Sequence, residues 1–515
     1  MTKSNSAFRI PQSALGWLLF AAVIIFVYLS GLSFPLVGPD EPRYAQVARE
    51  MFERGDWITP TLGGFNWFEK PALLYWLQIG SYHLFGVSEF AARFGSALFG
   101  MGTVASLWIL GQHVETTINE QRSTNRFSNW LGLIAASTVG IIAFAHGASF
   151  DIILTFPLTA AMVSFYIFDS SKRHAWLISF YFFIGLALLA KGLVGIVFPF
   201  AIVGVYHVLS WKLPNRIFVR SLVWGTFLAV AVASIWYLPM YMRHGYEFID
   251  QFFIQHHFQR YTSNKYFHPQ PFYFFFWVLP LMTIPWLPFF LAALWNFGKR
   301  VMGRADDAKA RTEITGTGSE AVLAPMPLLL FALAWLVVPL VFFSFSGSKL
   351  PGYILPSVPA AVILTAAYVY QFVQKAAWRT YLVQTIAAGT FAVILIAIVA
   401  FVPKFAEADS VKSLFAEAHE RGFDGLSVLM LHGVSHNAEF YASGRILRDE
   451  QGKQKKLLGP PDVLREIDQG GGGPVLVLVP LEYLYQLTQS EFLEVELLKT
   501  NDEAALVFVR SKRGS

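Results

Sequence analysis

The sequence contains no cysteine among its 515 residues. Disulfide bonds, thiolate metal ligands and a cysteine nucleophile are therefore excluded. Charged residues are also scarce, at 14% of the chain against roughly 25% in soluble proteins. The net charge is only +5 and no basic tract is present, so we do not expect a nucleic-acid partner.

Long apolar runs take the place of these charges. Hydrophobic residues make up 55% of the chain, and they are grouped in runs of about 20, the length that crosses the hydrocarbon core of a bilayer. We expect an all-α polytopic membrane protein with about 11 to 13 transmembrane helices. The first run lacks a clear cleavage site and is expected to remain as a span. The candidate spans are 13–33, 93–112, 129–147, 152–169, 176–190, 193–210, 221–241, 273–296, 325–345, 353–372 and 381–402, with 72–86 as a further segment that dips into the membrane.

Lysine and arginine are distributed unevenly among the connectors. When the spans are counted, the basic connectors fall on one side, which the positive-inside rule identifies as cytoplasmic. The N-terminus is then expected inside, whereas the loop 34–92 and the C-terminus are expected outside. These connectors hold Arg122, Arg126, Lys172, Arg173, Lys212, Arg216, Arg220, Lys299, Arg300, Arg304, Lys309, Arg311, Lys375 and Arg379.

The composition changes after residue 402. We expect a transmembrane domain at 1–402, which includes the outer loop 34–92, and a small α/β domain outside the membrane at 403–515. About 100 residues are enough to form a separate hydrophobic core. In this tail we expect strands at 427–431, 474–479 and 504–509. We expect helices at 463–467 and 481–487.

The outer stretch Leu36–Pro71 has the densest chemistry in the chain. Its beginning, Pro39-Asp40-Glu41-Pro42, predicts a helix N-terminus at which Asp40 can cap free N–H groups. An apolar stripe with helical spacing follows, and Gly55 suits the helix end, so we expect an amphipathic helix at the membrane interface. The stripe consists of Tyr44, Val47, Ala48 and Met51. An acid–base pair, Glu69-Lys70, closes the loop.

Four more polar positions lie beside apolar runs. Asp151 begins a span, Lys191 interrupts an apolar hairpin, and Lys349 lies in a turn of serines and glycines. Arg260 lies in the segment 253–273, which is dense in histidine and aromatic residues. The structural interpretations are helix capping for the acids, extension to the interface for the lysines, and an aromatic belt for this segment.

These positions gain meaning together, because the expected topology places all of them on the outer face. Acids beside several cations suit a lipid-linked phosphate and a reacting sugar. The histidines of the aromatic segment, His256, His257 and His268, do not have a standard metal spacing.

The stretch GPDEPRYAQVAREMFERGDWITPTLGGFNWFEKP resembles the first outer loop of the bacterial 4-amino-4-deoxy-L-arabinose transferases that modify lipid A. These enzymes belong to the protein mannosyltransferase-like glycosyltransferases of the GT-C fold. The resemblance continues at Asp151, Lys191-Gly192, 258–261 and 349–356, and it covers about residues 1–400. No motif is identified in the tail.

The resemblance implies transfer of a sugar from undecaprenyl phosphate to lipid A, or to a related envelope acceptor, at the periplasmic face of the bacterial inner membrane. It also implies an essential acid at Asp40 and a second functional acid at Asp151. A divalent metal at Glu69 is implied as well, although its histidine partner is not placed. The residues assigned to the carrier phosphate and the sugar are Lys70, Arg260, Lys349, Tyr353, Glu41, Arg43, Tyr44 and Lys191.

In this hypothesis, Lys70 and Arg260, with Lys349, neutralise the carrier phosphate. Asp40 acts as a base towards a hydroxyl acceptor or, if the acceptor is a phosphate, holds the donor sugar. Other readings stay open: a transferase that moves a hexose such as mannose to protein or polysaccharide, a lipid or solute transporter, and an outer assembly factor. Transporters place binding groups near the middle of the membrane and often have internal repeats, neither of which the sequence indicates.

Overall fold

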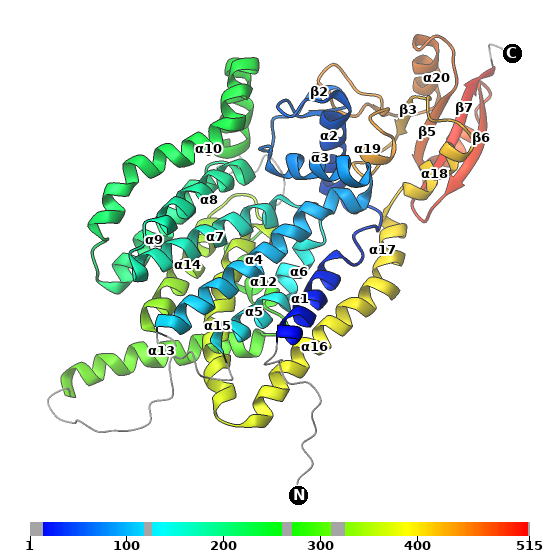
Figure 1. Ribbon diagram of the computed structural model, residues 1–515. Coiled ribbons are helices and arrows are strands. Elements are labelled where there is room, and N and C mark those ends of the chain that lie inside the picture. Colours follow the sequence, from blue (N-terminus) through cyan, green and yellow to red (C-terminus); the bar gives the residue numbers. More distant parts are fainter. Residues whose placement is uncertain (1–13, 118–125, 260–269, 311–324, 513–515) are drawn as a thin grey trace, which may run out of the picture. The chain divides into compact units, whose positions relative to one another are not determined.

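The computed structural model describes residues 14–117, 126–259, 270–310 and 325–512 (Figure 1). These residues divide into two compact units. The first contains residues up to Ser30, Glu69–Leu74 and Ser96–Leu395. The second contains Gly31–Phe68, Tyr75–Gly95 and Ile396–Ser515. The expected domain boundary at residue 402 stays a prediction, and the unit that includes the tail also includes most of the outer loop.

The first unit consists of helices, as the apolar runs predict. Six helices of the described chain are long and apolar enough to cross a membrane, or eight if two bent pairs count as one span each. The pairs α5–α6 and α12–α13 are bent by 53° and 116°, and α8 and α9 are shorter apolar helices. The all-α polytopic class is therefore confirmed. Fewer helices than the expected 11 to 13 pass this length test, because several predicted runs are bent or short.

The helix bounds follow the apolar runs closely. Together with the 3₁₀ helix η2 and the π-helix η1, the helices are α1 (Ala14–Leu29), α4 (Glu89–Thr117), α5 (Phe127–Ala136), α6 (Val139–Ala145), α7 (Phe150–Ser171), α8 (Ala175–Lys191), α9 (Val194–Ser210), α10 (Arg216–Phe248), η1 (Ile249–Gln259), α12 (Phe274–Met282), α13 (Leu287–Ala310), α14 (Met326–Ser344), η2 (Pro351–Ser357), α15 (Val358–Gln374) and α16 (Ala377–Ala400). Helix α7 packs against α8 and η2, which brings segments far apart in sequence to the beginning of α7.

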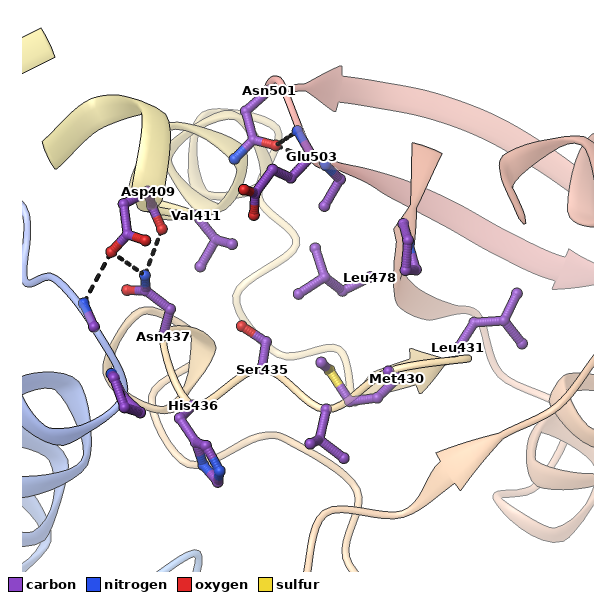
Figure 2. A pocket seen from close by; sticks show the side chains of 16 residues that line it. Asp409, Val411, Met430, Leu431, Ser435, His436, Asn437, Leu478, Asn501 and Glu503 are labelled. Carbon is purple, nitrogen blue, oxygen red and sulfur yellow. Dashed lines mark hydrogen bonds between the residues drawn. The ribbon is translucent and has the colours of Figure 1, made fainter. Parts of the chain in front are cut away.

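The second unit contains a five-stranded sheet of order β4-β3-β5-β7-β6. Strands β4, β3 and β5 are parallel, whereas β7 is antiparallel to both β5 and β6. The carboxyl ends of β3 and β5 lie at a cavity (Figure 2). The strands are β3 (Val428–Leu431), β4 (Lys456–Leu457), β5 (Val475–Pro480), β6 (Leu493–Thr500) and β7 (Ala504–Ser511).

Helices cover both faces of this sheet, because the buried residues of β3 and β5 alternate between two cores. One core joins Leu429 and Val477 to Ile467, and the other joins Met430 and Leu476 to Phe415. The α/β tail is thus confirmed, including its three predicted strands. The helices of this unit are α2 (Asp40–Arg54), α3 (Leu73–Phe85), α17 (Val402–Asp409), α18 (Lys412–Glu420), α19 (Ala438–Tyr441), α20 (Pro460–Gln469), η3 (Leu481–Tyr483) and α21 (Leu484–Thr488), with a small hairpin β1 (Thr61–Leu62) and β2 (Phe65–Asn66).

Candidate functional site

Helix α2 of the second unit begins at Asp40, as its sequence predicts. The apolar stripe of Tyr44, Val47, Ala48 and Met51 is buried, and Gly55 ends the helix with a φ of 64°. A left-handed residue of this kind favours glycine, because it has no Cβ to clash. Tyr44 therefore belongs to the packed side of α2.

Asp40 does not cap this helix, so that interpretation is wrong. The N-cap position is taken by Pro39, and no side-chain cap bond forms there. The carboxylate instead forms an ion pair with Arg43, one turn further along, and its side chain is 49% exposed. The Arg43 guanidinium in turn lies 5.8 Å from the centre of the Trp67 ring. Asp40 is thus an accessible acid that is oriented by its own helix.

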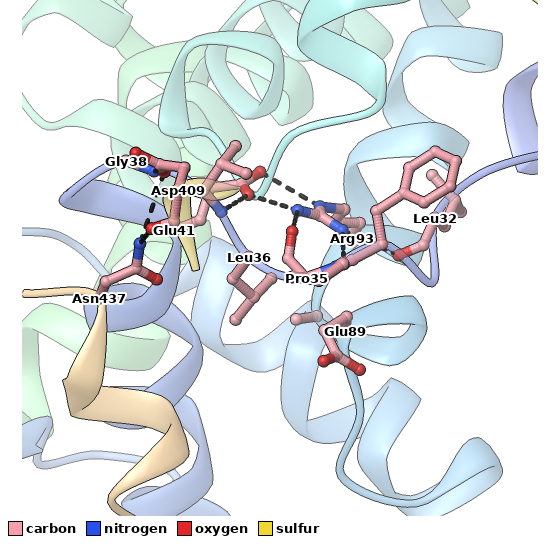
Figure 3. Close-up of polar contacts among 12 residues, drawn as sticks. Leu32, Pro35, Leu36, Gly38, Glu41, Glu89, Arg93, Asp409 and Asn437 are labelled. Atoms are coloured by element: carbon pink, nitrogen blue, oxygen red, sulfur yellow. Dashed lines mark hydrogen bonds and ion pairs between the residues drawn. The ribbon is translucent and has the colours of Figure 1, made fainter. Parts of the chain in front are cut away.

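The backbone before α2 is held by a buried arginine that the sequence interpretation missed. Arg93, near the beginning of α4, pairs with Glu41 at 2.6 Å, and the two side chains are 4% and 13% exposed. The same guanidinium donates to three carbonyls, those of Leu32 at 3.1 Å, Phe34 at 2.5 Å and Pro35 at 2.9 Å (Figure 3). Glu41 also accepts a bond from the N–H of Val37. Glu41 is therefore a positioning residue for the chain that leads to Asp40.

Residues of the tail hold the same backbone. The Tyr441 hydroxyl accepts a bond from the N–H of Leu36 at 2.8 Å and donates to Glu89 at 3.2 Å. Asp409 accepts from the N–H of Gly38 at 2.8 Å and is joined to Asn437 (Figure 3). Burial raises the pKa of the Tyr441 phenol, so it stays protonated and can donate. The segment that leads to Asp40 is thus fixed by side chains about 400 positions away in the sequence.

In the first unit, three predicted residues meet at the beginning of α7. The Asp151 carboxylate forms an ion pair with Lys191, the last residue of α8. The Lys191 ammonium also lies 4.8 Å from the centre of the Tyr353 ring in η2. Capping is the wrong interpretation for Asp151, because Ser149 caps α7 by accepting the N–H of Asp151 at 3.1 Å. The lysine does not extend to the interface as expected. Its ammonium is instead held by the Asp151 carboxylate and the face of the Tyr353 ring.

Gly352 makes this approach possible. A Cβ built at this position would overlap the Asp151 carboxylate, whereas one built at Gly389 in α16 would meet no atom within 4 Å. We expect Gly352→Ala to destabilise the protein by about 1–3 kcal/mol, the usual range for overpacking, and to displace Asp151 from Lys191. Thermal unfolding of the purified protein measures the effect, with Gly389→Ala as the matched control. Equal midpoints for the two variants would contradict the close packing of Gly352 on Asp151.

Lys349 binds backbone carbonyls of its own turn and of a neighbouring segment. Its side chain is buried, and its ammonium donates to the carbonyls of Ser346 at 2.7 Å and Gln270 at 3.0 Å. Desolvation lowers the pKa of this ammonium. The contacts favour a bracing role for Lys349, between its turn and the beginning of α12, over direct contact with a phosphate.

Glu69 and Lys70 are half-buried in the first unit, just before α3. Within the described ranges, no group of three or more histidine or acidic residues could hold a metal ion. A metal at Glu69 therefore stays a prediction, and no catalytic step is assigned to it. Arg260 and His268 lie outside the described residues, as do the side chains of His256 and His257.

Comparison with known proteins agrees with this architecture. The undecaprenyl phosphate-alpha-4-amino-4-deoxy-L-arabinose arabinosyl transferase of Serratia proteamaculans is 30% identical over 388 residues, which cover 74% of this chain and 63% of that protein. The transferase of the same name from Aeromonas salmonicida is 29% identical, with coverages of 75% and 65%. The matched region thus spans less than two thirds of these relatives.

Solved structures give the same fold. The crystal structure of ArnT from Cupriavidus metallidurans bound to undecaprenyl phosphate matches this protein with a TM-score of 0.77 at 21% sequence identity. The match covers 96% of this chain and 98% of the ArnT chain. The sequence profile described as dolichyl-phosphate-mannose-protein mannosyltransferase matches residues 14–298. Because this match takes in more than half of the 515 residues, the chain belongs to the dolichyl-phosphate-mannose-protein mannosyltransferase family.

Proposed function

We propose that this protein is a glycosyltransferase that moves 4-amino-4-deoxy-L-arabinose from undecaprenyl phosphate to lipid A or a related envelope acceptor. The main support is its similarity along most of its length to relatives that are named arabinosyl transferases of this carrier-linked sugar, together with a shared fold with the carrier-bound structure. The carrier phosphate is itself the leaving group, so catalysis requires charge neutralisation and alignment. Lys70 and Arg260 are the cations proposed for the phosphate.

Lys191 is a further proposed cation for the donor. Asp151 orients its ammonium and the Tyr353 ring lies beside it, so this group is held in one place before a ligand binds. A cation held in advance stabilises a developing negative charge without the cost of reorganisation. We assign Asp151 to positioning Lys191, and Tyr353 to the wall on which the carrier headgroup rests.

Asp40 is the acid proposed for the acceptor or for the donor sugar. Arg43 engages one carboxylate oxygen, and the side chain is half-exposed. A hydroxyl acceptor would need a base, whereas a phosphate acceptor is already anionic and would leave Asp40 to bind the sugar or its amine. In either case an acceptor oxygen attacks the sugar carbon that carries the phosphate, the bond from this carbon to the phosphate oxygen breaks, and the carrier phosphate leaves with inversion at the carbon.

Mass spectrometry of lipid A tests the function. Bacteria that express the protein should contain lipid A with an added aminopentose, and bacteria that lack it should not. A second reaction, with the purified protein and undecaprenyl phosphate linked to either the aminopentose or mannose, separates this function from hexose transfer, the activity named in the family description. Transfer of mannose alone would overturn the choice of sugar.

We also propose that the protein lies in the bacterial inner membrane, with the tail and Asp40 in the periplasm. The absence of cysteine makes thiol labelling a clean test. Gln489→Cys in the tail should react with a membrane-impermeant maleimide once the outer membrane is permeabilised. Leu213→Cys, in an exposed and predicted cytoplasmic connector, should react only after lysis. The reverse pattern would contradict this orientation.

A further inference from the structure

A cavity of about 440 Å³ lies in the second unit at the carboxyl ends of β3 and β5. Its volume is within the range of small-molecule sites. Its walls come from four segments: the chain before α2, the α17–α18 connector, the loop after β3, and the turn between β6 and β7 (Figure 2). The polar side chains of the wall are Asp409, Ser435, His436, Asn437, Asn501 and Glu503.

The strand order explains why a cavity forms here. Strand β3 lies between β4 and β5, and all three are parallel. The chain leaves β3 towards β4 on one side, and it leaves β5 towards β6 and β7 on the other. Connections that diverge in this way leave a crevice outside the carboxyl ends of the strands, which is where open α/β sheets bind ligands.

The charges of the wall select the ligand. None of the 16 lining residues is a lysine or an arginine, whereas Asp409 and Glu503 supply two carboxylates. An anionic ligand is therefore disfavoured, and groups that donate hydrogen bonds, such as hydroxyls and amines, are favoured. The Glu503 carboxylate and the Ser435 hydroxyl point into the same space from opposite walls (Figure 2).

The rest of the lining suits the carbon skeleton of a sugar. Val411, Met430 and Leu478 supply apolar surface between the polar groups. The Asp409 and Glu503 carboxylates and the Ser435 hydroxyl supply hydrogen-bond acceptors on the same lining. Alternating apolar surface and acceptors match a molecule that has C–H faces and a rim of hydroxyls.

We propose that this cavity binds a sugar, either neutral or amine-bearing, and discriminates against phosphorylated sugars. The cavity lies wholly in the second unit, and sugar binding to it can be measured without turnover. Gly38 and Pro39 form part of the wall, and Asp409 holds the N–H of Gly38. A bound sugar therefore touches the backbone within two residues of Asp40, so the tail contributes a sugar subsite beside the chain that carries the proposed catalytic acid.

Saturation-transfer NMR on the intact protein in detergent tests the proposal. The probes are D-glucose, D-glucosamine, 4-amino-4-deoxy-L-arabinose and D-glucose 6-phosphate. We expect saturable binding of the first three in competition with one another, and the weakest binding for the phosphate. Tighter binding of the aminopentose identifies a donor sugar as the source, and tighter binding of glucosamine identifies an acceptor sugar; either result supports the site.

Variants of the lining residues test whether the sugars bind in this cavity. Val434 is exposed and lines the opening, so Val434→Trp should fill it and remove most of the binding. Glu503→Gln should weaken the two amino sugars about two- to fivefold, the effect of one exposed charge pair, and should change glucose less. Asp502→Asn, the exposed neighbour outside the wall, is the matched control and should bind like the parent protein.

Three results would overturn the proposal. The first is an absence of saturable binding by any of the three favoured sugars. The second is binding of glucose 6-phosphate as tight as that of glucose. The third is unchanged sugar binding in Val434→Trp, which would place the signal elsewhere in the protein. None of these depends on lipid A modification, so failure of the subsite is distinguishable from failure of the proposed transferase function.

Discussion

Replacing Asp40 by asparagine is expected to lower sugar transfer by at least about 10²-fold, the smallest usual loss when an acid–base group is removed. Asparagine keeps the shape of the side chain and one carbonyl oxygen, but it loses the negative charge and cannot take a proton. Both proposed roles require that charge, either as a base or as a partner for the amine of the sugar. Initial rates of the reconstituted transfer reaction measure the loss.

Stability should change little in the same variant. The pair with Arg43 is an i,i+3 pair in which the Asp40 side chain is 49% exposed, and such surface pairs contribute about 1 kcal/mol at most. Glu53→Gln is the matched control, because Glu53 is an exposed acid of the same helix and is paired with Arg49. We expect Glu53→Gln to keep activity within about twofold, the effect of one such surface pair. Retained transfer in Asp40→Asn, at a normal thermal midpoint, would contradict a role for Asp40 in the reaction.

Donor sugars with and without an amine, together with the Asp40→Glu variant, separate the two roles of Asp40. If it acts as a base towards a hydroxyl acceptor, Asp40→Glu should recover part of the activity. If it binds the sugar amine, the loss in Asp40→Asn should be larger for the aminopentose than for a neutral pentose on the same carrier. A loss that is equal for both sugars favours the base.

Much of the local structure could be predicted because its cause is local. The spacing of the apolar residues identifies α2, and Gly55 identifies its end. In the tail, continuous apolar runs predicted β3, β5 and β7. Most residues of these strands are buried in the structure, so their sequences are apolar without alternation. Strand β4 was missed because it has two residues, and β6 because charged residues alternate along its exposed face.

The sequence predicts which residues gather at the candidate site, but it does not predict their individual contacts. Topology placed Asp151, Lys191 and Tyr353 on one face, and the structure brings them together. The sequence does not reveal that Lys349 is occupied by two carbonyls, because any polar side chain can bind a neighbouring backbone. It also does not reveal that Asp409 holds the N–H of Gly38, because that contact joins positions 371 residues apart.

The role of Arg93, in contrast, could have been predicted from the sequence. An arginine at the first position of a predicted span is costly unless a partner is near. Its partner Glu41 is 52 positions earlier, inside the loop that carries the proposed catalytic acid. A search for an acid to pair with this arginine would have linked the loop to the beginning of α4.

The largest stability effect is therefore expected for Arg93→Met. This change removes the buried Arg93 guanidinium from the largely buried Glu41 carboxylate, and breaking a buried ion pair costs about 3–5 kcal/mol. It also removes the donors to the carbonyls of Leu32, Phe34 and Pro35, so the backbone before α2 should loosen. We expect a lower thermal midpoint in detergent and, because Asp40 follows this backbone, a loss of transfer even at temperatures at which the variant is folded.

The double variant Glu41→Gln/Arg93→Met separates the two contributions. Neutralising Glu41 removes the charge that Arg93 compensates, so the double variant should be more stable than Arg93→Met alone. It should not reach the parent protein, because three carbonyls still lack the donors that Arg93 supplied and each unsatisfied buried group costs about 1–3 kcal/mol. Full recovery would mean that Arg93 acts only as the counter-ion of Glu41. Partial recovery of stability without recovery of transfer would show that the hold of Arg93 on the backbone, more than the charge pair, places Asp40 for the reaction.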